Sequence, residues 1–185
     1  MRKELKPNLE FIERIFPKVN ELTKKGIMII SDCSSYKIDL FSEDRLQRII
    51  NIAKENLESN SFKIIEKELE NIIGKDIAKY HNINLWFRPD SEFVAFKICL
   101  SDPIKINNFK KEELKEIITK IWKRSFLEKD ELNYYISKFS YQLIYYYKEL
   151  LKLNFENYKP EYFEYERSHF FDDNREEIIN KIWNK

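Results

Sequence analysis

Glycine is scarce in this sequence of 185 residues, where it occurs only as Gly26 and Gly74. Dinucleotide-binding fingerprints need three closely spaced glycines, and the P-loop and the nucleophile elbow each need two at short spacing. Because Gly26 and Gly74 lie far apart in the chain, the sequence excludes these phosphate-binding and hydrolase motifs.

Cysteine and histidine are equally scarce. Cys33 and Cys99 do not make a disulfide framework and are expected to be buried thiols, while His81 and His169 show no metal-ligand spacing. No nucleophile stands beside a base at a spacing typical of nucleophilic catalysis. We therefore expect no catalytic residues, no metal site and no cofactor, and a protein that is not an enzyme.

Net charge and long apolar runs are lacking as well. The 33 basic and 32 acidic residues give a formal net charge of +1, which argues against nucleic-acid binding through bulk charge. No apolar run of about 18 residues is present, and no secretion signal precedes the first periodic segment. The sequence predicts a cytoplasmic protein without a membrane partner.

Apolar and aromatic residues, by contrast, are abundant. Hydrophobic residues make up 43% of the chain and aromatic residues 15%, which is enough to bury one substantial core. No Ser/Gly/Pro-rich linker divides the sequence. We therefore predict a single domain over residues 1–185.

The periodicity of the apolar residues predicts both helices and strands. Spacings of three and four predict a helix over residues 8–25, with a kink at Pro17 and a stop at Gly26. Alternating patterns predict two hairpins, over residues 27–40 and 83–100. Further helices are predicted over residues 42–57 with Ser42 as the N-cap, after Ser61 through Ile64 to Ile73, and over 111–124, 130–153 and 175–183. About six helices around a small antiparallel sheet of about four strands make an α+β fold.

The predicted helix over residues 130–153 has two unlike faces. At 100° per residue, one face collects apolar side chains, among them Leu143, Tyr147 and Leu150. The opposite face, which we call the Tyr/Lys face, contains no acidic residue and consists of Tyr134, Lys138, Tyr141, Tyr145, Lys148 and Lys152. Tyrosine is enriched at protein interfaces, and tyrosine beside cations can also stack nucleic-acid bases.

Residues 154–173 form an acidic aromatic segment between this helix and a predicted C-terminal helix over residues 174–185. The candidate partner-binding residues in this segment are Glu161, Tyr162, Glu164, Tyr165, Glu166, Asp172 and Asp173. The segment complements the Tyr/Lys face in charge and in aromatic content. Two arrangements stay open: the segment folds back and covers that face, or one or both surfaces remain open to a partner.

These features predict a non-enzymatic protein–protein interaction protein of the small inhibitor, immunity-protein or antitoxin type, from a bacterium or a phage. Such a protein binds and neutralises a partner enzyme, for example a toxin nuclease. The acidic aromatic segment could imitate the phosphates and bases that a basic nuclease recognises.

Two alternatives remain open. The carboxylates of residues 161–173, together with His169, are a candidate divalent-metal site of an enzyme. The Tyr/Lys face is a candidate site for single-stranded nucleic acid, although nucleic acid is not the partner that we expect. Dimerisation of the chain is left open.

Overall fold

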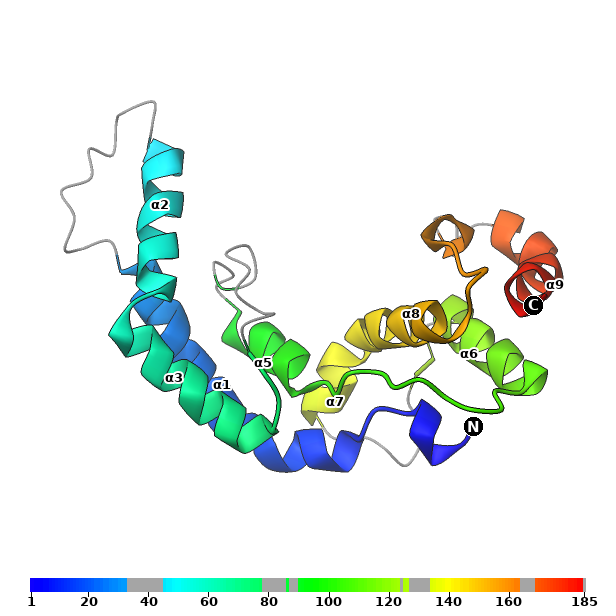
Figure 1. Ribbon diagram of the computed structural model, residues 1–185, viewed down its shortest axis with the longest axis horizontal. Helices are drawn as coiled ribbons and strands as arrows, with labels where there is room; N and C mark the ends of the chain where they lie inside the picture. Colours follow the sequence, from blue (N-terminus) through cyan, green and yellow to red (C-terminus); the bar gives the residue numbers. More distant parts are fainter. Residues whose placement is uncertain are drawn as a thin grey trace. The chain divides into compact units, whose positions relative to one another are not determined.

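A computed structural model describes residues 1–32, 45–77, 86, 90–123, 125–126, 134–163 and 169–184. All regular structure in these ranges is helical (Figure 1). The α-helices are α1 (Leu9–Ser31), α2 (Arg45–Leu57), α3 (Asn60–Ile73), α5 (Ser91–Cys99), α6 (Lys111–Lys123), α7 (Tyr134–Phe139), α8 (Leu143–Asn154) and α9 (His169–Trp183). Short 3-10 turns lie at Lys3–Leu5, Ser140–Gln142 and Pro160–Phe163.

The predicted α+β class is wrong, because no strand occurs in the part of the chain that the structure describes. Ile27 to Ser31, predicted as the first strand, forms the last turns of α1, and residues 93–99 of the second hairpin form most of α5. Other residues of the two predicted hairpins, 33–40, 83–85 and 87–89, lie outside the described ranges.

Three helices were predicted correctly from the periodicity of their apolar residues. α6 spans the residues expected from its pattern, and α2 and α3 overlap theirs. Ser59 caps α3 by accepting a hydrogen bond from the Phe62 N–H at 3.2 Å, and Gly74 ends it with a φ of 74°. The predicted N-cap of α2, Ser42, lies outside the described residues.

The chain divides into two compact units, and each is described here by itself. Unit 2 is one continuous stretch, Glu10–Cys99, and unit 1 combines Met1–Leu9 with Leu100–Lys185. That both units fold together as a single domain stays a prediction from the sequence.

Unit 2 is built around Trp86, whose side chain is fully buried. Phe62 of α3 meets the Trp86 ring edge-on, with ring centroids 5.0 Å apart and an interplanar angle of 88°. α5 is buried on nearly all sides, and the Ser91 hydroxyl at its start donates to Asn20 Oδ1 of α1 at 2.9 Å. A helix surrounded by protein on most of its circumference has no polar face, which explains its apolar sequence.

Unit 1 has its core where α6 packs against α8 and α9. The inner residues of α6 that fill this core are Leu114, Ile117, Ile118 and Ile121. Leu5, near the start of the chain, is fully buried in the same unit. The Asn154 side chain holds the extended stretch before α6, because it accepts from the Ile106 N–H at 2.6 Å and donates to the Ile104 carbonyl at 3.1 Å.

Candidate partner-binding surface

The segment that carries the Tyr/Lys face is a broken helix. The prediction of one continuous helix over residues 130–153 is wrong, since α7 ends at Phe139 and a 3-10 turn at Ser140–Gln142 precedes α8. Phe139 leaves helical geometry with φ −106° and ψ 10°, and the Ser140 hydroxyl donates to the Ser137 carbonyl at 3.0 Å. A serine that hydrogen-bonds the preceding turn in this way competes with regular helix geometry. Residues 130–133 lie outside the described ranges.

The inner side of α8 is the apolar face that the sequence predicts. Leu143, Tyr147 and Leu150 are buried, and the Tyr147 ring stacks on Phe126 with centroids 5.7 Å apart. Tyr146 is buried beside them, and burial raises the pKa of its hydroxyl to about 12. These contacts fix the rotation of α8 about its axis and thereby determine which residues face outward.

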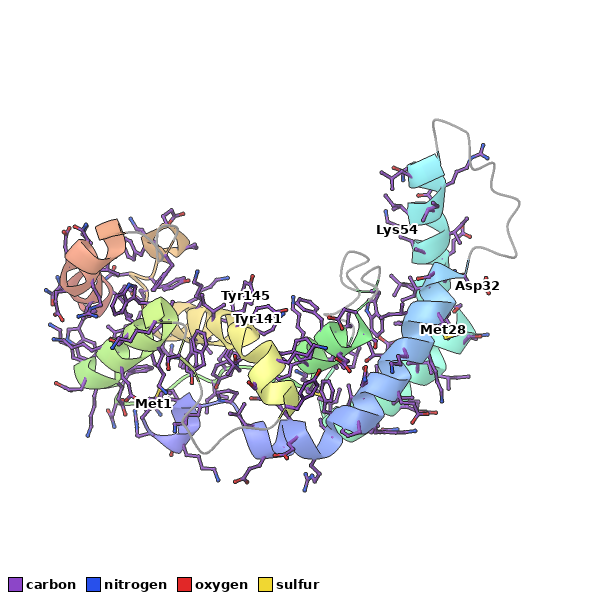
Figure 2. All side chains as sticks on the ribbon, turned by 180° about the vertical axis from the view of Figure 1, so that it is seen from behind. Met1, Met28, Asp32, Lys54, Tyr141 and Tyr145 are labelled. Atoms are coloured by element: carbon purple, nitrogen blue, oxygen red, sulfur yellow. The ribbon has the colours of Figure 1, made fainter. Side chains whose placement is uncertain are left out.

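The tyrosines of the Tyr/Lys face point outward. Tyr134 is 68% exposed, Tyr141 46% and Tyr145 60%. Tyr141 and Tyr145 project from the same side of the segment (Figure 2). Several large side chains exposed together on one face of a segment are typical of a surface that binds a partner.

The lysines of the Tyr/Lys face differ in the groups that their ammonium nitrogens contact. Lys138 lies over the Phe139 ring at 5.0 Å and over the Tyr134 ring at 6.0 Å. Lys148 lies over the Phe163 ring at 5.4 Å. Lys152 Nζ is 3.7 Å from a carboxylate oxygen of Glu149.

Glu149 is the residue that sequence reasoning missed at this surface. The helical pattern placed it just outside the Tyr/Lys face, which was therefore predicted to be free of acidic groups. The signal was available, because Glu149 follows Tyr145 by four residues and precedes Lys152 by three, and such residues are neighbours on a helix. The surface therefore combines two central tyrosines with a mixed-charge end.

The acidic aromatic segment is docked in its first part. Phe163 is buried and stacks on Tyr158 with centroids 5.7 Å apart, while Tyr162 is half-buried and Glu161 exposed. Through Lys148 this part reaches α8, yet Tyr141 and Tyr145 remain exposed. The fold-back arrangement is thus observed at one end of the Tyr/Lys face and not over its tyrosines, as far as the described residues extend.

The rest of the segment is described less fully. Glu164, Tyr165 and Glu166 lie outside the described residues, and Asp172 and Asp173 are described in their backbone only. Both aspartates belong to α9, which begins at His169 and not, as predicted, after residue 173. Their partner-binding role stays a prediction.

Two lysines of α6 are paired with residues of the same unit. Lys111 donates to Asn180 Oδ1 at 2.7 Å, and Lys115 forms an ion pair with Glu176 at 3.1 Å. Both partners lie on α9, so these lysines join two helices of unit 1.

Other candidate chemistry is sparse among the described residues. Burial raises the pKa of the Cys99 thiol to about 12, which keeps it protonated and unreactive near neutral pH, whereas Cys33 lies outside the described residues. No group of three potential metal ligands comes together in the described ranges, but the side chains of Glu164, Glu166 and His169 are not among those described. None of the described helices is long and apolar enough to cross a membrane.

Comparison with known proteins found no match. No protein-family description, no curated protein and no solved structure matches it.

Proposed function

We propose that this protein is a non-enzymatic cytoplasmic interaction protein, of the small inhibitor, immunity-protein or antitoxin type, that binds and neutralises a partner enzyme such as a toxin nuclease. The observation that carries the proposal is the exposure of Tyr134, Tyr141 and Tyr145 on one segment. The acidic aromatic segment contacts α8 at Lys148 and leaves Tyr141 and Tyr145 exposed.

The energetics support a contact surface. A tyrosine can bury roughly 150–250 Å², and at about 25 cal/mol per Å² the exposed parts of Tyr141 and Tyr145 would contribute about 2 kcal/mol each on binding. Tyrosine also loses little side-chain entropy when it is immobilised, which is one reason for its enrichment at binding hot spots. The exposed carboxylate of Glu161 adds an acidic group of the kind that a basic enzyme would recognise.

Co-expression tests the proposal. The chain, carrying an affinity tag, is expressed together with the untagged products of the genes that flank it in its genome. We expect one flanking product to co-elute at equal stoichiometry and to lose its enzymatic activity in the complex. Tyr141→Ala combined with Tyr145→Ala should weaken the complex at least about tenfold, as expected for hot-spot residues.

Met28→Ala is the matched control. Met28 is 72% exposed but belongs to α1 of unit 2, so the proposal expects no change in affinity. The proposal fails if no flanking product co-elutes, or if the double tyrosine variant binds as well as the Met28 variant does. A complex that forms but leaves the partner fully active would contradict the inhibitor role.

A further inference from the structure

The outer side of the α7–α8 segment has an ordered arrangement along its axis. A cation stands at each end, and a pair of tyrosines lies between them. Lys138 precedes Tyr141 by three residues, Tyr145 follows by four, and Lys148 follows by three more. These are the spacings at which neighbouring side chains on helical turns stack along one face.

The two cationic ends are held differently. At the first end, the exposed Lys138 stands over the rings of Tyr134 and Phe139, which anchor it beside the tyrosine pair. At the second end, Lys148 stands over Phe163, and Lys152 keeps 63% of its side chain exposed while it approaches Glu149 at 3.7 Å. Exposed ion pairs of this length contribute little to stability, so Lys152 can exchange Glu149 for another carboxylate at small cost.

The presence of Glu149 separates two classes of partner. A nucleic-acid strand carries a phosphate at every nucleotide and needs a continuous track of cations. Glu149, 61% exposed on the same turn as Lys148 and Lys152, interrupts such a track and repels phosphate. A protein segment can place its acids only where the lysines are, so the pattern of charges favours a protein.

We propose that the α7–α8 face binds an acidic segment of a protein partner, whose apolar centre covers Tyr141 and Tyr145 and whose carboxylates meet Lys138 at one end and Lys148 with Lys152 at the other. The proposal rests on the proposed function and specifies the chemistry of the partner at this surface. From Lys138 to Lys148 the face extends roughly 15–20 Å, given the rise per residue of α- and 3-10 helices. A partner helix of about three turns has the matching length.

A pair of synthetic helical peptides tests this chemistry without knowledge of the natural partner. Both have about 14 residues and the same Leu/Phe centre, and they differ only in flanks of glutamate or of lysine. Binding to the full chain is measured by fluorescence anisotropy. We expect the glutamate-flanked peptide to bind at least about tenfold more tightly than the lysine-flanked one, and this preference to shrink as salt rises from about 0.05 to 0.5 M.

Charge variants of the chain sharpen the test. Lys138→Glu should weaken binding of the glutamate-flanked peptide about tenfold, whereas Lys3→Glu, an equal charge change at an exposed residue of the first 3-10 turn, should not. Glu149→Gln should strengthen binding about threefold, because it removes the carboxylate that stands 3.7 Å from Lys152 at the second cationic end. A gain of affinity cannot come from misfolding, so this variant keeps the test decisive if Lys138→Glu perturbs the fold.

The outcomes separate the two proposals. Equal binding of both peptides, no binding of either, or no response to Glu149→Gln overturns this inference. Tighter binding of a poly-dT strand of about 12 nucleotides than of the acidic peptide also overturns it, and assigns the face to nucleic acid instead. A flanking gene product that binds through Tyr141 and Tyr145 without any dependence on Lys138 would leave the proposed function intact while this inference fails.

Discussion

Gly26 illustrates what a single residue decides in this fold. The sequence suggests a helix stop there, but α1 continues to Ser31. The reason for glycine is the close approach of Trp86, because a Cβ at position 26 would lie 2.8 Å from Cζ3 of Trp86 and 3.3 Å from Cε2 of Phe62. The lower helix propensity of glycine, about 1 kcal/mol relative to alanine, is offset by this packing.

We therefore predict that Gly26→Ala destabilises the protein. The added methyl group would force a buried ring to move, and overpacking of this kind lowers the free energy of unfolding by about 1–3 kcal/mol. Urea denaturation followed by circular dichroism measures the change. Asn71→Ala on the exposed side of α3 is the control, and its gain in helix propensity should leave stability equal or slightly higher. A Gly26→Ala variant as stable as that control would refute the packing argument.

Glu113 is a second residue with a role of its own, because the ionisation of its carboxyl makes the stability of the fold depend on pH. Burial would by itself raise the pKa of its carboxyl, but hydrogen bonds from the Arg2 guanidinium and from the Lys110 N–H outweigh burial and lower the pKa. The Arg2 Nη2 and the Lys110 N–H each donate to Oε2 at 2.9 Å. The carboxylate form therefore stabilises the folded state.

The sign of the pH effect follows from the lowered pKa. The contribution of Glu113 is fully present above its ordinary pKa of 4.5 and is lost as the pH falls below that value, since the unfolded chain then binds the proton more tightly. Glu113→Gln should be less stable at pH 7 and lose less stability on acidification to pH values below about 4.5 than the natural chain. Glu112→Gln, at the exposed preceding position, controls for the change of charge. Parallel pH curves for the Glu113 variant and the natural chain would contradict the prediction.

At the scale of elements, the break between α7 and α8 carries an unusual buried group. Gln142 is 2% exposed, and its Nε2 finds no hydrogen-bond acceptor among the described residues. A buried unpaired amide costs about 1–3 kcal/mol. Replacing it with an apolar side chain of similar size removes that cost.

Gln142→Leu is accordingly expected to leave the free energy of unfolding unchanged or to raise it by about 1 kcal/mol. Leu143→Ala, at the neighbouring buried position, should lower it by about 2–5 kcal/mol because it opens a cavity. Thermal unfolding of both variants decides the point. A loss of stability in Gln142→Leu comparable to that of Leu143→Ala would mean that the amide has a structural partner.

Helices with one polar face could be predicted from the sequence, and the buried helix α5 could not. In α3 and α6 the apolar residues recur at spacings of three and four, so the period itself identifies a helix. In α5 nearly all side chains are apolar, because protein surrounds the helix on most sides, so the spacing of three and four does not stand out. A short apolar run with Val94, Phe96 and Ile98 alternates as a strand would, and no local signal separates the two structures.

The candidate surface was predictable for a related reason. The 100° rule placed Tyr134, Tyr141 and Tyr145 opposite the core of a continuous helix, and the real segment is broken. The break changes the rotation by only about 60°, since three residues turn at 120° instead of 100°. That offset leaves the tyrosines outside, whereas the ion pair of Glu149 with Lys152 depends on side-chain positions that periodicity does not specify.

At the scale of the whole molecule, chain topology connects the two units. Unit 2 is inserted between the two segments of unit 1, so unit 1 needs Met1–Leu9 and Leu100–Lys185 to meet. Within unit 1 the first segment contributes the fully buried Leu5 and the pairing of Arg2 with Glu113. When unit 2 is folded, it connects Leu9 to Leu100 as a folded body and not as a flexible chain. When unit 2 unfolds, the same contacts must close a flexible loop of about 90 residues, at an entropic cost of about 4–5 kcal/mol.

This topology predicts that damage to unit 2 weakens unit 1, as a single domain requires. Leu69→Ala removes a fully buried side chain of α3 and should destabilise unit 2 by about 2–5 kcal/mol. In a Trp122→Phe, Trp183→Phe background, the fluorescence of Trp86 reports on the unfolding of unit 2 alone. In the Trp86→Phe chain, the fluorescence of Trp122 and Trp183 reports on the unfolding of unit 1. We expect both reporters to show the lower unfolding midpoint in the Leu69→Ala variant, although Leu69 lies in unit 2. A shift confined to the Trp86 signal would show that the two units unfold independently and that the chain is not one cooperative domain.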